Sequence, residues 1–170
     1  AEYCGVPFGI WGDGEIPILR LAEAFAGGHE IRSVPGLVYT DGKGYRKSRA
    51  CFREFSSIPP LRRDWVDNRR YHDEGGMGSF ETRRGCASRC VYCPEPVVKG
   101  RRYRLKPPSD VAGEIESLLS QGVDHFHTCD SEFNLPYGHA VEVCSELMRR
   151  KLGGRIRWYT YLAPAPFDEK

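Results

Sequence analysis

The chain has 170 residues, of which 40% are hydrophobic and 28% charged, and its formal net charge is +2. This composition is typical of a globular protein with a proper core, and the charge is too small to predict a nucleic-acid-binding surface. We find neither an apolar run long enough to span a membrane nor a secretory signal peptide. The seven cysteines, an odd number, exclude a fully paired disulfide framework and favour a reducing cytoplasm.

The first 28 residues read as a strand, a turn and a helix. An apolar run over 8–11 predicts the strand, and apolar residues at helical spacing then continue up to Gly27 and Gly28, which end the helix. The turn between them consists of Gly12, Asp13, Gly14 and Glu15. It lies just past the carboxyl end of a strand, where open α/β sheets bind ligands. Asp41 and Gly42 then separate two strand-like runs and predict a hairpin.

Residues 56–78 read as a linker that wraps a neighbouring domain. This stretch holds two adjacent prolines, many charges and the Gly75-Gly76 pair. The sequence "GSFETRRG" then predicts a short strand that leads into a cysteine-rich loop.

Strands and helices alternate after that loop. Ser109 is the expected N-cap of a helix that buries Val111, Ile115, Leu118 and Leu119 and ends at Gly122. A strand follows over about 124–129, then a helix over about 139–151 with Val143, Leu147 and Met148 among its apolar positions, and a third strand in "RIRWYTYL". This order predicts parallel βα units, too few to close a barrel. The chain begins without Met and ends at "APFDEK", which resembles the first turn of a helix, so we expect a piece of a longer protein.

The loop "GCASRCVYCPEP" concentrates Cys86, Cys90 and Cys93 within eight positions. Thiolates select zinc, copper or iron–sulfur clusters, but structural zinc and electron-transfer clusters usually take four protein ligands. Cys129 is the best fourth candidate, because it ends a strand at the same rim. Three ligands from one loop fit better a [4Fe–4S] cluster with one open iron. Both alternatives, zinc and a four-cysteine cluster, stay open on the spacing alone.

The motif "TRRGCASRCVYC", with Tyr92 before the last cysteine, resembles the cluster loop of radical S-adenosylmethionine (SAM) enzymes. The stretches "GRRYRLKPPSDVAGEIESL" and "HFHTCDSEFNLPYGHAVEVCSELMRR" are similar to the corresponding parts of cobalamin-binding radical SAM proteins. "FGIWGDGEIPILRLAEAFAGG" resembles the end of the cobalamin domain that precedes the radical domain there. The resemblance therefore covers nearly the whole chain.

The resemblance implies an α/β fold in three parts. Residues 1–28 would be the C-terminal end of a Rossmann-like cobalamin domain, 29–77 a hairpin and linker, and 78–170 the first three strands of a parallel βα barrel. Gly12, Asp13, Gly14 and Glu15 would face cobalamin. The chain lacks the D-x-H-x-x-G pattern that supplies a lower histidine ligand in some cobalamin domains.

The resemblance also implies a mechanism. Cys86, Cys90 and Cys93 would bind the [4Fe–4S] cluster, and the open iron would chelate SAM. An electron from the cluster would split the sulfonium and give a 5′-deoxyadenosyl radical. The implied partners are a small-molecule or peptide substrate and an electron donor such as ferredoxin or flavodoxin. The first interpretation is a cobalamin-dependent methyltransferase or an enzyme of a related carbon-skeleton modification. A radical SAM enzyme without cobalamin, methylthiotransferase-like, and a non-catalytic iron–sulfur or zinc module are the alternatives.

The stretch "CDSEFN" follows the second strand, at the rim where such barrels place their active sites. Family members often have a glycine-glycine-glutamate motif there, and this chain has Asp130, Ser131 and Glu132 instead. We expect Asp130 or Glu132, preferably Glu132, to accept hydrogen bonds from the SAM ammonium group. The alternative is that Asp130 caps a loop and Glu132 is solvated. Tyr92 would stack near the adenine or only pack in the loop.

Two histidines, His125 and His127, alternate along the second strand on the face opposite Phe126 and Thr128. They would line the barrel interior near a substrate, or be packed and satisfied. On the second helix, Cys144 is expected to pack beside Val141 and Met148 and not to bind the cluster.

Overall fold

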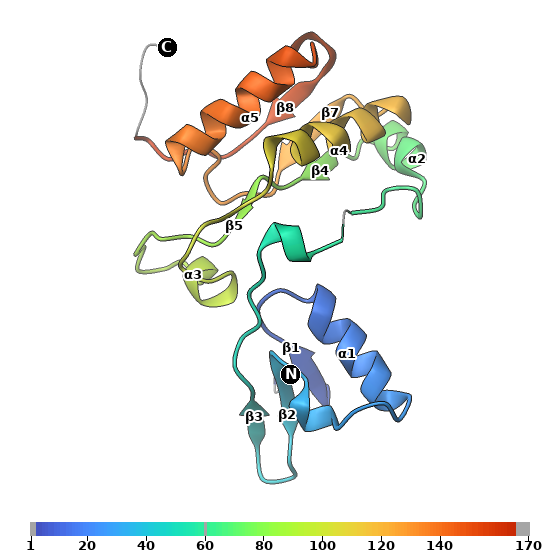
Figure 1. Ribbon diagram of the computed structural model, residues 1–170, viewed down its shortest axis with the longest axis vertical. Coiled ribbons are helices and arrows are strands. Elements are labelled where there is room, and N and C mark those ends of the chain that lie inside the picture. The colour runs from blue at the N-terminus through green and yellow to red at the C-terminus, as the bar shows by residue number, and fades with distance from the viewer. Residues whose placement is uncertain (1–2, 60, 166–170) are drawn as a thin grey trace. The chain divides into compact units, whose positions relative to one another are not determined.

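The computed structural model describes residues 3–59 and 61–165 (Figure 1). These residues form two compact units. Unit 1 comprises 1–54 and 87–101, and unit 2 comprises 55–86 and 102–170, each within the described range. Residues 166–170, where the sequence predicts the start of a helix, lie outside the described part.

Unit 1 contains a three-stranded antiparallel sheet in the order β1-β2-β3. The strands are β1 (Phe8–Ile10), β2 (Leu37–Thr40) and β3 (Tyr45–Lys47). The predicted hairpin is confirmed, because β2 and β3 pair antiparallel around a turn in which Gly42 has a φ of +83°. Helix α1 (Glu15–Phe25) follows β1 as predicted, and the 3-10 turn η1 (Ile31–Ser33) leads into β2. Short helix α3 (Glu95–Val98) also belongs to this unit.

A small apolar cluster holds unit 1 together. Ala24, Val34 and Leu37 are buried at its centre, with Phe8 and Leu21 packed against them. The pairing of β1 with β2 is antiparallel, so a Rossmann-like ending of 1–28 stays a prediction.

Unit 2 is built on a parallel sheet in the order β4-β7-β8, which confirms the predicted parallel βα units. Its strands are β4 (Gly78–Phe80), β7 (His125–Thr128) and β8 (Arg157–Tyr159). Helices α4 (Pro108–Ser120) and α5 (Tyr137–Arg149) lie side by side and pack on the sheet through the core (Figure 1). A two-stranded antiparallel ribbon of β5 (Arg83–Arg84) and β6 (Arg104–Leu105) flanks this sheet, and η3 (Gly153–Arg155) precedes β8.

The core of unit 2 follows the predicted periodicity. Val111, Ile115 and Leu118 of α4 are fully buried against Phe80 and Phe126 of the sheet. Gly122 ends α4 with a φ of +84°, as expected of a helix stop.

Two expectations for the helices are wrong. Pro107, not Ser109, occupies the N-cap of α4, because Pro108 at the first helical position forces the residue before it into an extended conformation. Met148 and Val141 of α5 are exposed, since the stripe that faces the sheet runs through Val143 and Leu147.

The segment predicted as a linker contains structure. It holds the 3-10 turn η2 (Phe55–Ser57) and helix α2 (Asn68–Asp73). The Asp67 carboxylate accepts a hydrogen bond from the Arg70 N–H and caps α2. The Asn68 amide donates to Gln121 Oε1 at 2.7 Å, so this helix is attached to the end of α4.

Candidate functional site

The cysteine loop lies between β5 and α3. Cys86 is buried, Cys93 is half-buried and Cys90 is exposed, and no disulfide joins any of the seven cysteines, all of which the structure describes. The Cys93 N–H donates to the Cys90 carbonyl at 3.2 Å, which closes a turn between these two ligand candidates. Cys86 belongs to unit 2, whereas Cys90 and Cys93 belong to unit 1. The convergence of the three sulfurs on one point therefore stays a prediction.

Tyr92 extends into solvent from this loop. It is 86% exposed, and its neighbour Val91 is fully exposed. The side chain is thus not packed within the loop, and its predicted role beside adenine stays untested.

Asp130 links the ends of two neighbouring strands. Its carboxylate accepts hydrogen bonds from the Thr82 N–H at 2.9 Å, from the Thr82 hydroxyl and from the Arg83 N–H at 3.3 Å. The residue is buried, and desolvation raises the pKa of its carboxyl group above the usual value, although these hydrogen bonds oppose the shift. Asp130 therefore fixes the segment after β4 against the segment after β7.

Glu132 lies beside the first cysteine. Its Oε2 is 3.9 Å from Cys86 Sγ and 3.7 Å from Arg83 Nη2. Arg83 is itself buried, and it donates to the carbonyl oxygens of Gly85 and Glu132, the latter at 2.7 Å. The carboxylate of Glu132 is thus held near Cys86 by an arginine that also positions the backbone of both loops.

Sequence reasoning missed the residues that build this corner. Thr82, Arg83 and His139 are buried, and His139 Nε2 lies 3.0 Å from the Thr82 carbonyl oxygen. The guanidinium of Arg83 also stacks on Tyr103, 4.7 Å from the ring centroid. The sequence offers no signal for these contacts beyond the position of Thr82 and Arg83 directly before the cysteine loop.

The two histidines of β7 lie on the predicted face. Phe126 and Thr128 are fully buried on the helix side, whereas His125 and His127 are only half-buried. The ring of His127 stacks on Tyr159 with centroids 5.3 Å apart and contacts Tyr161 edge-on at 5.7 Å. Its Nε2 is buried without a hydrogen-bond partner. These rings form an aromatic surface on the face of the sheet opposite the helices.

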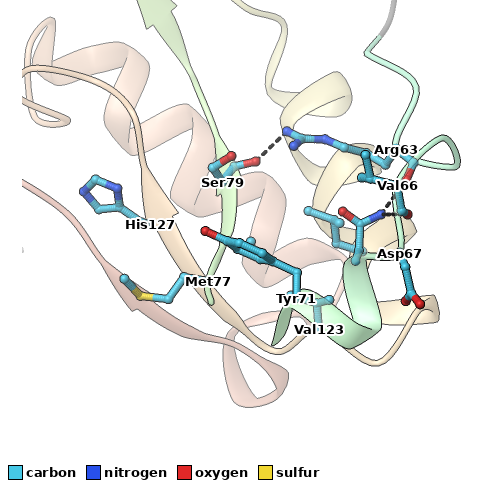
Figure 2. Close-up of a pocket in the computed structure, with 11 residues that line it drawn as sticks. Arg63, Val66, Asp67, Tyr71, Met77, Ser79, Val123 and His127 are labelled. Carbon is cyan, nitrogen blue, oxygen red and sulfur yellow. Dashed lines mark hydrogen bonds between the residues drawn. The ribbon is translucent and has the colours of Figure 1, made fainter. Parts of the chain in front are cut away.

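A cavity of about 550 Å³ extends from this face toward α2 (Figure 2). Its lining includes His127, Met77, Tyr71 and Arg63, and Arg63 is held by the carbonyl oxygen of Ser79. The cavity is large enough for a small molecule, and it combines aromatic and apolar walls with a guanidinium and an imidazole.

The four residues of the predicted cobalamin turn have structural roles in unit 1. Gly12 has a φ of +92°, and a Cβ there would lie 2.3 Å from the Cys51 carbonyl oxygen. Asp13 is buried, donates its N–H to that same oxygen at 2.7 Å and accepts from the Arg53 N–H at 2.6 Å. Gly14 is the N-cap of α1, and Glu15 is its first residue. Contact with cobalamin is not tested by these roles and stays a prediction.

No family model matches this chain. It is, however, homologous to radical SAM enzymes that also bind cobalamin, as the sequence resemblance predicts.

Two relatives are similar to nearly the whole chain. The chain is 30% identical over 226 residues to tryptophan 2-C-methyltransferase of Streptomyces laurentii, covering 99% of this chain and 38% of that protein. It is 35% identical to the structure of the radical SAM methyltransferase TsrM of Kitasatospora setae with cobalamin and a [4Fe–4S] cluster bound, with a TM-score of 0.86 over 99% of this chain and 36% of that one. A second TsrM structure contains the tryptophan substrate and a SAM analogue.

A third comparison supports the fold alone. The cobalamin-dependent SAM radical enzyme OxsB is 23% identical, with a TM-score of 0.70 over 86% of this chain and 21% of that one. The chain thus spans little more than a third of the length of the tryptophan methyltransferase and of TsrM. Among the described residues, no helix is long and apolar enough to cross a membrane.

Proposed function

We propose that this chain supplies the cluster-binding loop and the SAM-facing rim of a cobalamin-dependent radical SAM methyltransferase that acts on a small molecule. The observation that carries the proposal is the proximity of Glu132 to Cys86, 3.9 Å between Oε2 and Sγ, in a corner fixed by Asp130 and Arg83. A cysteine ligand and a carboxylate are both needed at a site that binds an iron–sulfur cluster together with a cationic cosubstrate.

The donor set fits the cluster. Cys86, Cys90 and Cys93 would supply three thiolates and leave one iron open, and no disulfide occupies them. When bound, the cluster and cobalamin supply the redox and methyl-transfer chemistry, which belongs to the cofactors. The work of this chain is to bind and orient them.

Glu132 is the better candidate for the SAM ammonium group. Both carboxylate oxygens of Asp130 already accept hydrogen bonds from Thr82, and the residue is only 4% exposed. Glu132 has the longer side chain and retains partial exposure beside Cys86. Ser131 and Tyr92 would assist at the same rim, as the resemblance implies.

The substrate would bind along the aromatic surface of the sheet. The rings of His127, Tyr159 and Tyr161 contact one another at centroid distances between 5.3 and 5.7 Å. Such a surface suits a planar aromatic compound, and the solved relative contains tryptophan. We therefore propose an aromatic amino acid or a related small molecule as substrate, and ferredoxin or flavodoxin as electron donor.

The proposal also divides the chain into three parts. Residues 1–28, with Gly12, Asp13, Gly14 and Glu15, would end a Rossmann-like cobalamin domain, 29–77 would connect it, and 78–170 would begin the barrel. The seven cysteines without disulfides favour the cytoplasm as the compartment. The methyltransferase reading is supported over the methylthiotransferase-like one by the relatives that match nearly the whole chain.

The proposal is tested with the full-length protein, purified without oxygen and reconstituted with iron, sulfide and hydroxocobalamin. Isotopically labelled SAM, a reductant and tryptophan are added, and label transfer is followed by mass spectrometry. We expect a corrinoid absorption spectrum and transfer of the methyl group. Consumption of SAM without labelled tryptophan would overturn the substrate assignment, and absence of both corrinoid and SAM turnover would overturn the function.

A further inference from the structure

Three side chains at the far end of β7 form a cluster that the proposed function does not use. They are His72 of α2, Asp124 before β7 and His125 at its first position, and all belong to unit 2. His72 Nε2 is 3.1 Å and His125 Nδ1 is 2.7 Å from the same oxygen, Asp124 Oδ1. The three donor atoms all lie within 4.8 Å of one another. Since Asp124 precedes β7 and Asp130 follows it, the cluster is at the amino end of the strand, away from the cysteine corner.

The contacts of His72 are those of a metal-binding histidine. Its Nδ1 lies 3.3 Å from the carbonyl oxygen of Gly76, which can accept a hydrogen bond from the ring. In that tautomer the lone pair of Nε2 faces Asp124 Oδ1, 3.1 Å away. A metal ion between these two atoms would be bound by both.

The backbone around His72 is suited to ligand binding. A carbonyl oxygen that accepts from the distal ring nitrogen is the usual outer partner of a metal-bound histidine, because it fixes the tautomer and the ring orientation. Here that carbonyl belongs to Gly76, where a Cβ would lie 2.2 Å from the Tyr71 ring. The close approach of this turn thus depends on glycine.

Asp124 provides the negative charge. The hydrogen bond to His125, followed by the charges of His125, His72 and Arg157, holds the pKa of Asp124 below its usual value. The nearby Arg69 is engaged by both carboxylate oxygens of Asp73 at 2.9 Å. Both imidazoles therefore face the same carboxylate oxygen of Asp124.

We propose that His72, Asp124 and His125 bind a divalent first-row transition metal, zinc in the first instance, through Nε2, Oδ1 and Nδ1. Two imidazoles and one carboxylate leave a fourth position for water. Ligand atoms about 2.0–2.2 Å from a tetrahedral zinc lie roughly 3.3 Å apart, close to the 3.1 Å between His72 Nε2 and Asp124 Oδ1. The 2.7 Å between His125 Nδ1 and Asp124 Oδ1 would have to lengthen. The side chains of Asp124 and His125 are 45% and 38% exposed, so they have room to move. The ion would clamp α2 onto the start of β7.

Arg157 gives the site a specific signature. Its Nη1 lies 3.1 Å from His125 Nε2, which accepts this bond in the neutral, metal-free ring. When Nδ1 binds a metal, Nε2 carries the proton instead and faces a donor with a positive charge. Gln at position 157 would offer an acceptor and remove the charge, so Arg157→Gln should strengthen zinc binding severalfold.

Zinc is the probe for the test, with the full-length protein carrying Ala at the three loop cysteines so that the cluster loop cannot bind it. Competition with a chromogenic chelator measures affinity, and cobalt substitution reports coordination. We expect one zinc per chain and a rise in melting temperature. His72→Ala and His125→Ala should each weaken binding about tenfold or more. His29→Ala, at an exposed histidine 3.3 Å from Glu23 in unit 1, should change nothing.

Three results would overturn the site. The first is an unchanged zinc affinity in both His72→Ala and His125→Ala. The second is that no zinc binds and that nitrogen NMR shows a proton on each ring nitrogen of His72. The third is a zinc affinity in Arg157→Gln that is unchanged or lower. The last variant removes no ligand, so it remains informative where a histidine variant fails to fold. Every protein in this test carries Ala at Cys86, Cys90 and Cys93. The outcome therefore does not depend on the proposed enzyme function.

Discussion

Asp130 shows what a single buried carboxylate does in this fold. The Oδ1 atom of Asp130 accepts hydrogen bonds from the N–H groups of Thr82 and Arg83, which are 48 and 47 residues away along the chain. A buried N–H that loses its acceptor costs about 1–3 kcal/mol. Asp130→Ala should therefore lower the free energy of unfolding by about 2–4 kcal/mol, measured by urea denaturation. A loss below about 0.5 kcal/mol, the level of an ordinary surface change, would contradict this role.

The same residue predicts a pH dependence. Because burial raises the pKa of Asp130 above 3.8, the folded state holds its proton at pH values where the unfolded state has released it. The stability that the protonated group contributes is complete below pH 3.8 and declines as pH rises through the elevated pKa. Relative to Asp130→Asn, the wild type should thus lose stability as pH rises through this window. A difference between the two proteins that is constant with pH would be inconsistent with the raised pKa.

The role of Glu132 in SAM binding is tested by comparing Glu132→Gln with Asp130→Asn. Glu132→Gln keeps the shape but removes the charge beside Cys86, so SAM affinity should fall on the order of tenfold while the cluster remains. Asp130→Asn should weaken SAM binding less, since Asp130 is occupied by Thr82 and Arg83. Titration of the reconstituted protein with SAM measures both. Normal affinity in Glu132→Gln would show that the ammonium is held elsewhere.

At the scale of elements, α4 is held by a buried ion pair as well as by its apolar face. Glu114 pairs with Lys106 and lies 3.6 Å from Arg63 Nη2, and the side chains of all three are at most 15% exposed. Removing one partner leaves buried charges uncompensated, at a cost of about 3–5 kcal/mol. We expect this loss for Glu114→Ala in chemical denaturation. Glu116→Ala, on the same helix but 43% exposed in its pair with Arg150, should cost less than about 1 kcal/mol. Equal losses in the two variants would refute the distinction.

Most helices and strands could be predicted from the sequence, because they depend on the spacing of nearby apolar residues and on glycines at their ends. The stripe of Val111, Ile115 and Leu118 defines α4, and Gly122 ends it. The sequence predicts a linker where the structure has helix α2, because five of its six residues are polar and Tyr71 alone makes no apolar stripe. The helix is held instead by a contact between Asn68 and Gln121, 53 residues away. Met148 was misplaced since an apolar residue on a short amphipathic helix can lie on either edge of its stripe.

At the scale of the whole molecule, the cysteine motif predicted the class of protein, and the comparisons confirm it. The corner beside it was beyond sequence reasoning, because Thr82, Arg83, Asp130 and His139 meet only through folding. The parallel pairing of β4, β7 and β8 brings the first two strand ends together, and Asp130 then selects Thr82. Of the SAM candidates in "CDSEFN", Asp130 already accepts hydrogen bonds from Thr82 and Arg83, and Glu132 stays the preferred prediction.

We propose that Cys86, Cys90 and Cys93 hold a [4Fe–4S] cluster whose open iron binds SAM. The most direct measurement is the electron paramagnetic resonance spectrum of the reduced full-length protein, with iron and sulfide content, before and after SAM is added. We expect four irons per chain, a spectrum that changes with SAM, and loss of the cluster in each Cys→Ala variant but not in Cys144→Ser. A complete cluster in all three Cys→Ala variants, or a spectrum indifferent to SAM, would contradict it.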